Sequence, residues 1–283
     1  VVATQVSAQS WISDTLSMGV GYSKDAYYSL PNGTLMTPDN GDWHIALEAL
    51  MINEQHGGVG IWTNEANKAG QSVKLYSLNK SGANFMAIAV ADTVGKKASP
   101  LHNDTSTYAI GAFNAVGAGG DFDYGWGFYN MEPVDEFPAH SVIGDSLFLL
   151  TLNTPGSMGS PDTENAAYIV WPRAFINANE YILYARPLES SVVDTIHVST
   201  QNANRVFRYY NFETKAVTDK EPEKDLWDFK MTNYMDLYNG AVDLGLQPVT
   251  GALISYFTKA AQVSNVIPND VIYTSIDSAA YND

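Results

Sequence analysis

One short pattern occurs twice in this chain and limits what the chain can fold into. A pair of tyrosines, a turn region and a tryptophan appear first around Trp43 and again around Trp227, which lies 184 residues later. In the first occurrence Asn32-Gly33 follows the tyrosine pair, and Asn-Gly between two β-prone runs is a strong hairpin signal. Each occurrence therefore predicts a hairpin followed by a loop that anchors a large indole ring in the core.

The residues that follow each tryptophan alternate between apolar and other types. The apolar positions are Ile45, Leu47, Phe229 and Met231. Residues two apart in a strand share one face, so these side chains are expected to pack together. The next matched strand is predicted in GVGIWTN (58–64) and in TGALISY (250–256).

β-prone runs dominate the rest of the chain. They are rich in Tyr, Phe, Trp, Val and Ile and are separated by Gly, Pro, Asn and Asp, which is typical of strands joined by turns. The runs are AYYSL (26–30), GVGIW (58–62), FMAIAVA (85–91), SLFLLTL (146–152), AAYIVW (166–171), EYILYAR (180–186), TIHVST (195–200) and VFRYYNF (206–212). Two stretches, 42–52 and 225–238, fit either a strand or a short amphipathic helix. The predicted fold class is mostly β, with antiparallel sheets or a sandwich built from hairpins and few short helices.

The stretch from 145 to 186 predicts three consecutive antiparallel strands. The runs SLFLLTL, AAYIVW and EYILYAR are separated by NTPGSMGSPDTEN and by PRAFINAN, which supply turn residues. The segment 101–141, which contains GAGGDFDYGWGFYN, is predicted to be an ordered surface loop.

Composition excludes several classes of protein. A chain of 283 residues suits one large or two ordinary domains. The formal net charge of −16 argues against nucleic acid and anionic membrane surfaces as partners, because both require a basic patch. The absence of cysteine excludes disulfides, thiolate nucleophiles and cysteine-held metals, and together with the lack of a long apolar run it favours an exported protein without a membrane span.

The repeated pattern resembles the HmuY-like domains of Bacteroidetes surface proteins, and most closely their longer relatives among type IX secretion substrates. The motifs that carry the resemblance are TLSMGVGYSKDAYYSL (15–30), YAIGAFN (108–114), YGWGFYN (124–130), VIGDSLFLL (142–150) and VTGALIS (249–255). His44 stands where the family pattern has aspartate, and Leu47 and Met231 stand where it has phenylalanine. The resemblance implies a β-rich domain at the outer cell surface or outside the cell.

Short Asp-Ser/Thr triplets support the same origin. The resemblance implies O-glycosylation at Asp followed by Ser or Thr and a small or apolar residue. The predicted acceptors are Thr15, Thr93, Thr195 and Ser278. Ser146 has the same context, but it begins an apolar run and is expected to be buried.

No known catalytic signature occurs in the chain, so it is expected not to be an enzyme and to have no catalytic residues. The densest acidic cluster contains Glu132, Asp135 and Glu136 and is predicted to be a solvated loop. A glycan-binding or carbohydrate-active protein is a second alternative, because aromatic side chains can stack on sugars. That alternative requires exposed rings, and the tryptophans to check for exposure are Trp62, Trp126 and Trp171.

Ligands for a cofactor or metal are few. No cofactor is expected, but the resemblance implies haem as an alternative, since HmuY itself binds haem. His56 and His102 are the candidate axial ligands, although an ordinary structural histidine is the commoner case. Asp121 and Asp123 form a possible calcium pair, and loop polarity explains them equally well.

The first hypothesis is a secreted, non-catalytic binding or structural protein whose partner at the cell surface is a protein or a glycan. Residues 1–190 are expected to form an HmuY-like β-domain. Residues 191–283 are expected to start a second, incomplete copy, or to supply strands that complete one core. The two-copy interpretation further predicts that the sequence is part of a longer protein, or that another chain completes it.

Overall fold

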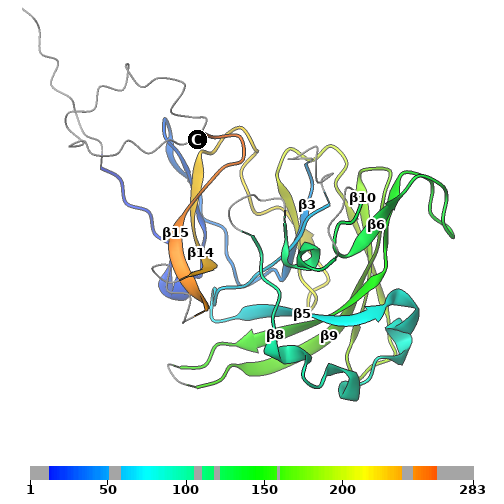
Figure 1. Ribbon diagram of the computed structural model, residues 1–283. Coiled ribbons are helices and arrows are strands. Elements are labelled where there is room, and N and C mark those ends of the chain that lie inside the picture. Colours follow the sequence, from blue (N-terminus) through cyan, green and yellow to red (C-terminus); the bar gives the residue numbers. More distant parts are fainter. Residues whose placement is uncertain are drawn as a thin grey trace, which may run out of the picture.

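The computed structural model describes residues 13–50, 59–104, 110–117, 122–157, 160–237 and 245–259. Every strand pairing within the described residues is antiparallel, and the strands form three sheets (Figure 1). The predicted fold class, mostly β and built from antiparallel sheets, is confirmed. In the two stretches that fitted either a strand or a helix, the described residues form strands at Ile45–Glu48 and Phe229–Leu237.

The largest sheet has seven strands. They are β5 (Ser72–Ser81), β6 (Gly127–Asn130), β7 (Ser141–Gly144), β8 (Ser146–Thr154), β9 (Thr163–Ile176), β10 (Glu180–Pro187) and β11 (Asp194–Ser199). The predicted run of three strands is confirmed, because β8 pairs with β9 and β9 pairs with β10. The turn between the last two is shorter than predicted, since residues 172–176 continue β9 and the turn begins at Asn177.

Four hairpins make the two smaller sheets. Their strands are β1 (Ala26–Ser29), β2 (Gly33–Met36), β3 (Ile45–Glu48), β4 (Ile61–Thr63), β12 (Phe207–Tyr210), β13 (Val217–Thr218), β14 (Phe229–Leu237) and β15 (Leu246–Ile254). One sheet has the order β15-β14-β1-β2, and the other has the order β13-β12-β3-β4. Each small sheet therefore joins a hairpin from the start of the chain to a hairpin from its end.

The two occurrences of the tyrosine–tryptophan pattern are structurally equivalent. We call strands β1–β4 repeat 1 and strands β12–β15 repeat 2. Tyr27 of repeat 1 lies opposite Lys230 of repeat 2, and Tyr209 of repeat 2 lies opposite Ala46 of repeat 1. These pairs occupy matching positions relative to Trp227 and Trp43, so exchanging the repeats maps one small sheet onto the other. The repeats are therefore interleaved rather than placed one after the other.

The same equivalence appears in the aromatic core between the small sheets. Tyr27 contacts Trp227 edge to face at a centroid distance of 4.9 Å, and Tyr209 contacts Trp43 in the same way at 4.9 Å. Both tryptophans are buried, as predicted for the anchors. Each anchor therefore holds the tyrosine strand of the other repeat.

The expectation that residues 191–283 begin a separate, unfinished copy is wrong for the strands described here. β11 extends the large sheet, β12 pairs with β3, and β14 pairs with β1. Ile196 and Phe212 share one hydrophobic cluster with Ile45, so these C-terminal strands complete the same core. This outcome matches the alternative that the later strands complete one core. Residues 260–283 lie outside the described part.

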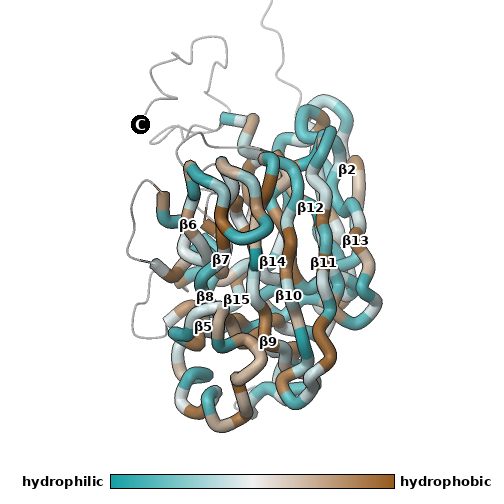
Figure 2. The backbone as a smooth tube through the Cα atoms, turned by 90° about the vertical axis from the view of Figure 1, so that its right-hand side faces the viewer, coloured by the Kyte–Doolittle hydropathy of each residue, from teal (hydrophilic) through white to brown (hydrophobic). Residues whose placement is uncertain are grey.

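Alternating burial explains how the strands position this core. In β11 the side chains of Ile196 and Val198 are buried, whereas Thr195 and His197, which alternate with them, are exposed. Figure 2 shows hydrophobic and hydrophilic residues mixed along the neighbouring strands β10 and β11. Trp126, in a segment predicted to be a surface loop, is fully buried and donates its indole N–H to the Val59 carbonyl at 3.0 Å.

Among the residues that the structure describes, the helical segments are short and of the 3-10 type. They are η1 (Val20–Tyr22), η2 (Gly82–Ala87), η3 (Val90–Thr93), η4 (Lys96–Ala98) and η5 (Ala112–Ala115). The run FMAIAVA (85–91), predicted to be a strand, instead spans parts of η2 and η3. The buried Arg186 guanidinium donates hydrogen bonds to the carbonyls of Phe85 and Ile88 at 3.0 and 2.6 Å. These carbonyls therefore bind a side chain of β10 and not the backbone of a neighbouring strand.

His44, which follows Trp43, has an equivalent in repeat 2. The Nδ1 atom of His44 accepts a hydrogen bond from the Phe212 amide at 3.0 Å, and the Asp228 carboxylate accepts one from the Leu30 amide at 2.7 Å. The two acceptors hold equivalent strand ends. Burial lowers the pKa of His44 to about 4, so the imidazole is neutral at neutral pH and keeps its acceptor nitrogen.

His44 is expected to make the fold sensitive to mild acid. Its folded pKa of about 4 lies below the ordinary value of 6.5, so between these values the unfolded chain binds the proton more readily. Stability from this residue is complete above pH 6.5 and is lost as pH falls towards 4. Between pH 7.5 and pH 5 the wild type should lose about 2 kcal/mol from this source. Urea unfolding at both pH values measures the loss.

The His44→Asn variant provides the matched comparison, because its amide oxygen can accept the Phe212 hydrogen bond without titrating. The pH-dependent loss should be smaller in this variant by about 2 kcal/mol. An equal loss in the two proteins would show that other groups cause the acid sensitivity.

Candidate functional site

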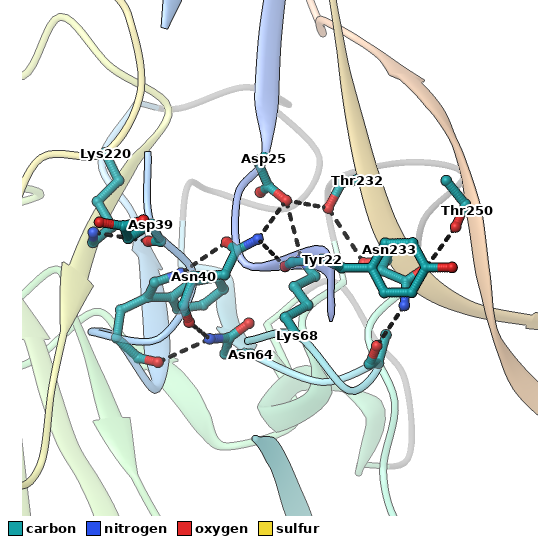
Figure 3. Close-up of polar contacts among 12 residues, drawn as sticks. Tyr22, Asp25, Asp39, Asn40, Asn64, Lys68, Lys220, Thr232, Asn233 and Thr250 are labelled. Atoms are coloured by element: carbon teal, nitrogen blue, oxygen red, sulfur yellow. Dashed lines mark hydrogen bonds and ion pairs between the residues drawn. The ribbon is translucent and has the colours of Figure 1, made fainter. Parts of the chain in front are cut away.

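A buried polar cluster lies where the two repeats meet. We define it as Asp25, Asn40, Lys68, Thr232 and Asn233, which come from both repeats and from the segment after β4. The Asp25 carboxylate accepts hydrogen bonds from Thr232 at 2.7 Å and from Asn40 at 2.9 Å, and it lies 3.8 Å from the Lys68 ammonium (Figure 3). Buried charges are costly unless paired, so the cluster is a candidate site as well as a structural junction.

An unusual turn holds Lys68 in this cluster. Ala66, Asn67 and Ala69 have positive φ angles of 74°, 55° and 53°, a conformation that side chains with a Cβ seldom adopt. Asn233 donates to the Ala66 carbonyl at 2.8 Å and thereby fixes the turn to repeat 2. Strained backbone of this kind persists only where its surroundings hold it, and it concentrates at functional sites.

The electrostatics of the cluster favour an ionised carboxylate at Asp25. Burial raises the pKa of the Asp25 carboxyl, but Lys68, Lys230 and the hydrogen bonds from Asn40 and Thr232 outweigh burial and hold that pKa below its ordinary value. Lys68 also lies 5.8 Å from the centroid of the Trp43 ring, which stabilises its positive charge. Burial lowers the pKa of Lys68, and the nearby Asp25 carboxylate opposes that shift. Asp25 is therefore an ionised carboxylate within ion-pair distance of Lys68.

A small cavity of about 40 Å³ adjoins the cluster. Its walls combine aromatic rings with charged and polar groups. They include Trp43, Trp62, Phe207, Tyr209, Thr63, Lys68 and Lys230. The cavity therefore lies inside the aromatic core between the small sheets.

A larger cleft of about 270 Å³ lies on the other side of Glu65, which lines both spaces. The Glu65 carboxylate contacts the His102 Nδ1 atom at 2.8 Å and accepts the Asn103 amide at 3.0 Å. Much of the apolar wall comes from the starts of β5 and β15 and the end of β14, which supply Val73, Leu246, Pro248 and Met235. Leu101, which follows η4, adds to this wall.

The structure brings one predicted ligand residue to this cleft. His102 lines it, whereas His56 lies outside the described residues. Asp121 also lies outside them, and the Asp123 carboxylate accepts the Gly125 amide at 2.8 Å as part of a turn. Within the residues described, no group of three or more His, Cys, Asp or Glu side chains could hold a metal ion.

The predicted glycosylation acceptors differ in exposure. Thr15 and Thr195 are exposed, and Ser278 lies outside the described residues. Thr93 is only 6% exposed, and its hydroxyl donates to the Val90 carbonyl at 2.7 Å. A folded chain therefore presents Thr15 and Thr195, but not Thr93, to a modifying enzyme.

The aromatic platform that a glycan-binding surface requires is not present among the described tryptophans. Trp43, Trp62, Trp126 and Trp227 are buried, and Trp171 is half-buried. The acidic cluster behaves as predicted for a solvated loop, because Glu132, Asp135 and Glu136 are exposed. Asp135 and Glu136 contact Arg173 at 2.9 and 3.5 Å.

Sequence patterns did not single out the residues of the polar cluster or Lys230. In a local sequence pattern, a buried charged residue of a strand looks the same as a charged residue that faces solvent. The pattern therefore does not indicate that the residue is buried. Alignment of the two repeats does give one, because Lys230 occupies the position of Ala46 and Asp25 occupies the position of Phe207. A charge that replaces an apolar residue at an equivalent core position marks a place where the repeats have diverged.

Comparison of the chain with protein-family models, with curated proteins and with solved structures found no match. In the part of the chain that the structure describes, no helix is long and apolar enough to cross a membrane.

Removing one charge of the Asp25–Lys68 pair is expected to lower the free energy of unfolding more than removing both charges. Lys68→Met leaves a buried carboxylate without its nearest cation and should destabilise the fold by about 3 kcal/mol or more. The double variant Asp25→Asn, Lys68→Met removes both charges and retains a hydrogen-bonding group at residue 25, so it should be the more stable of the two. Urea unfolding at pH 7 measures both. A double variant no more stable than Lys68→Met would contradict the pairing.

Proposed function

We propose that this protein is a secreted, non-catalytic binding protein of Bacteroidetes type, related to HmuY-like surface proteins and exported by type IX secretion. The observation that carries the binding role is the cleft of about 270 Å³ at the junction of the repeats. Ligand sites are concave and combine mostly apolar walls with a few placed polar groups. The cleft is concave and combines apolar and polar groups in similar number, since Met235, Leu246 and Pro248 line it together with Glu65 and His102.

The hydrogen bonds around the cleft favour binding over catalysis. Both oxygens of Glu65 are engaged, one by His102 and one by the Asn103 amide. Lys74 and Asp162, which also line the cleft, form an ion pair at 2.7 Å. Hydrogen bonds and ion pairs among the lining residues hold the side chains in fixed positions. A site of fixed shape with fixed polar groups suits recognition of a ligand.

Export is supported by the two exposed Asp-Thr triplets. Asp14-Thr15 lies on the described N-terminal segment and Asp194-Thr195 begins β11, and both threonines are exposed. Acceptor hydroxyls must be accessible to a modifying enzyme. The location proposed is therefore the outer cell surface or the extracellular space, where these threonines carry glycans.

Mass spectrometry of the protein isolated from its source cells tests export of this type. Peptides that contain Thr15 and Thr195 should carry hexose, whereas the peptide that contains the buried Thr93 should be unmodified. The Thr93 peptide is the internal control, because its Asp-Thr-Val sequence has the same pattern. Unmodified peptides at both exposed threonines would remove this support for the proposed origin.

Haem is a second candidate ligand, and the setting of His102 favours it. The Nδ1 atom of His102 lies 2.8 Å from Glu65 Oε2, and a carboxylate on one ring nitrogen orients the other nitrogen as a ligand. Met235, a possible soft ligand, lines the same cleft. In this version of the function the protein is a haem carrier.

Titration with haemin distinguishes a haem carrier from a protein that binds another ligand. A carrier should give a saturable Soret shift that is reduced at least about tenfold in affinity by His102→Ala. His197→Ala is the matched control, since His197 Nδ1 lies 3.0 Å from Glu180 Oε1 on an exposed strand. No saturable shift, or equal effects of the two substitutions, would exclude His102 as the haem ligand.

A further inference from the structure

Lys230 is a cation for which the surrounding fold supplies no direct polar partner. It lies on β14 opposite Tyr27 and opposite Leu253, is partly buried, and has its ammonium 5.8 Å from the centroid of the Tyr27 ring. No hydrogen bond or ion pair from this ammonium occurs within the described residues. Its charge attracts the buried carboxyls of Asp25 and Glu221, whereas the equivalent residue of repeat 1 is the uncharged Ala46.

A buried hydroxyl without a partner lines the same cavity as Lys230. Thr63 is 3% exposed, and its Oγ1 atom has no hydrogen-bond partner within the described residues. A buried hydroxyl that lacks a partner costs free energy. Lys230 and Thr63 thus provide two donors that line one cavity of about 40 Å³.

The other charged groups near this cavity already have partners. Lys68 is paired with Asp25, and both oxygens of Glu65 are engaged. The buried carboxylate of Glu221 accepts hydrogen bonds from the Tyr209 hydroxyl at 2.7 Å and the Val206 amide at 2.9 Å. Lys230 and Thr63 therefore retain donor capacity at the cavity.

We propose that this cavity is a subsite that binds a carboxylate group of the ligand, with Lys230 and Thr63 as the donors. The proposal rests on the proposed binding function and specifies the chemistry of its ligand. A carboxylate oxygen accepts a charge-assisted hydrogen bond from an ammonium and a second bond from a hydroxyl.

The size and the walls of the cavity select this group. One water occupies roughly 10–15 Å³ by the same measure, so 40 Å³ admits about three non-hydrogen atoms, the number in a carboxylate. Trp43 and Trp62 supply flat aromatic walls that suit a planar group. Lys68 and Lys230 line the cavity together with Glu65, and both oxygens of Glu65 are already engaged by His102 and Asn103. The subsite is therefore expected to select planar carboxylates over tetrahedral sulfate or phosphate.

Titration of the full chain with sodium acetate at constant ionic strength tests the proposal, with tryptophan fluorescence and calorimetry as readouts. Trp43 and Trp62 line the cavity, so acetate should change the fluorescence saturably, with a Kd on the order of 1–10 mM for so small a probe. Sodium sulfate and sodium chloride should produce no saturable change at the same ionic strength. This pattern would separate recognition of a carboxylate from general screening.

Two substitutions identify the donors. Lys230→Ala introduces the residue that repeat 1 has at the equivalent position, and it should weaken acetate binding at least about tenfold. Thr63→Val keeps the side-chain shape, removes the hydroxyl and should weaken binding about threefold or more. Lys80→Ala is the charge-matched control, because Lys80 is exposed on β5 and remote from the cavity walls, and it should bind acetate as the wild type does.

Circular dichroism and thermal unfolding establish that each variant is folded. No saturable response to acetate, equal responses to acetate and sulfate, or wild-type affinity in a folded Lys230→Ala variant would each overturn the carboxylate subsite. None of these results depends on haemin or on glycosylation. Failure of the subsite is therefore distinguishable from failure of the proposed function.

Discussion

The contact between a tyrosine of one repeat and a tryptophan of the other is the interaction on which the remaining structure depends. Tyr27 and Trp227 form one such contact, and Tyr209 and Trp43 form the other. Edge-to-face aromatic pairs add about 0.5–1.5 kcal/mol beyond the area that they bury. Their larger effect is geometric, because each contact fixes the register of a strand pair whose members are far apart in the sequence.

Interleaving also explains the location of the candidate site. The junction of the repeats brings together side chains from β1, β3, β4, β12 and β14. If the two repeats had identical sequences, equivalent residues on the two sides of this junction would be the same. Instead, one side carries Asp25 and Lys230 where the other carries Phe207 and Ala46. The divergence of the repeats leaves charge and a cavity on one side, while the matched aromatic pairs preserve the framework.

Much of the fold could be predicted from the sequence, because strand residues, turn residues and the repeated pattern are local signals. The three strands between 145 and 186 and the hairpin at Asn32-Gly33 illustrate this. The interleaving could not be predicted, since local periodicity does not specify which distant strand becomes the partner. The run 85–91 was misassigned for a related reason. Its β-prone residues are bound through their carbonyls by Arg186, about 100 residues away.

The candidate site was less predictable than the fold. His102 could be nominated as a residue that bears useful chemistry, but only the tertiary structure shows that Glu65 contacts its Nδ1 atom. Lys68 was not nominated, because its burial depends on the positive φ angles of the turn 66–70 and on the hydrogen bond from Asn233. Such features arise from contacts between segments and leave no regular spacing in the sequence.

The interleaved repeats also impose an order on synthesis. The strand that begins at Ala26 pairs with a strand that contains Met231, so its partner is translated about 200 residues later. At roughly 5–20 residues per second, the first hairpin waits on the order of 10–40 seconds for that partner. During this interval its aromatic face has no native surface to cover it. Folding must therefore be largely post-translational, and any ribosome-bound or shortened chain that stops before β14 exposes Tyr27 and the edge of β1.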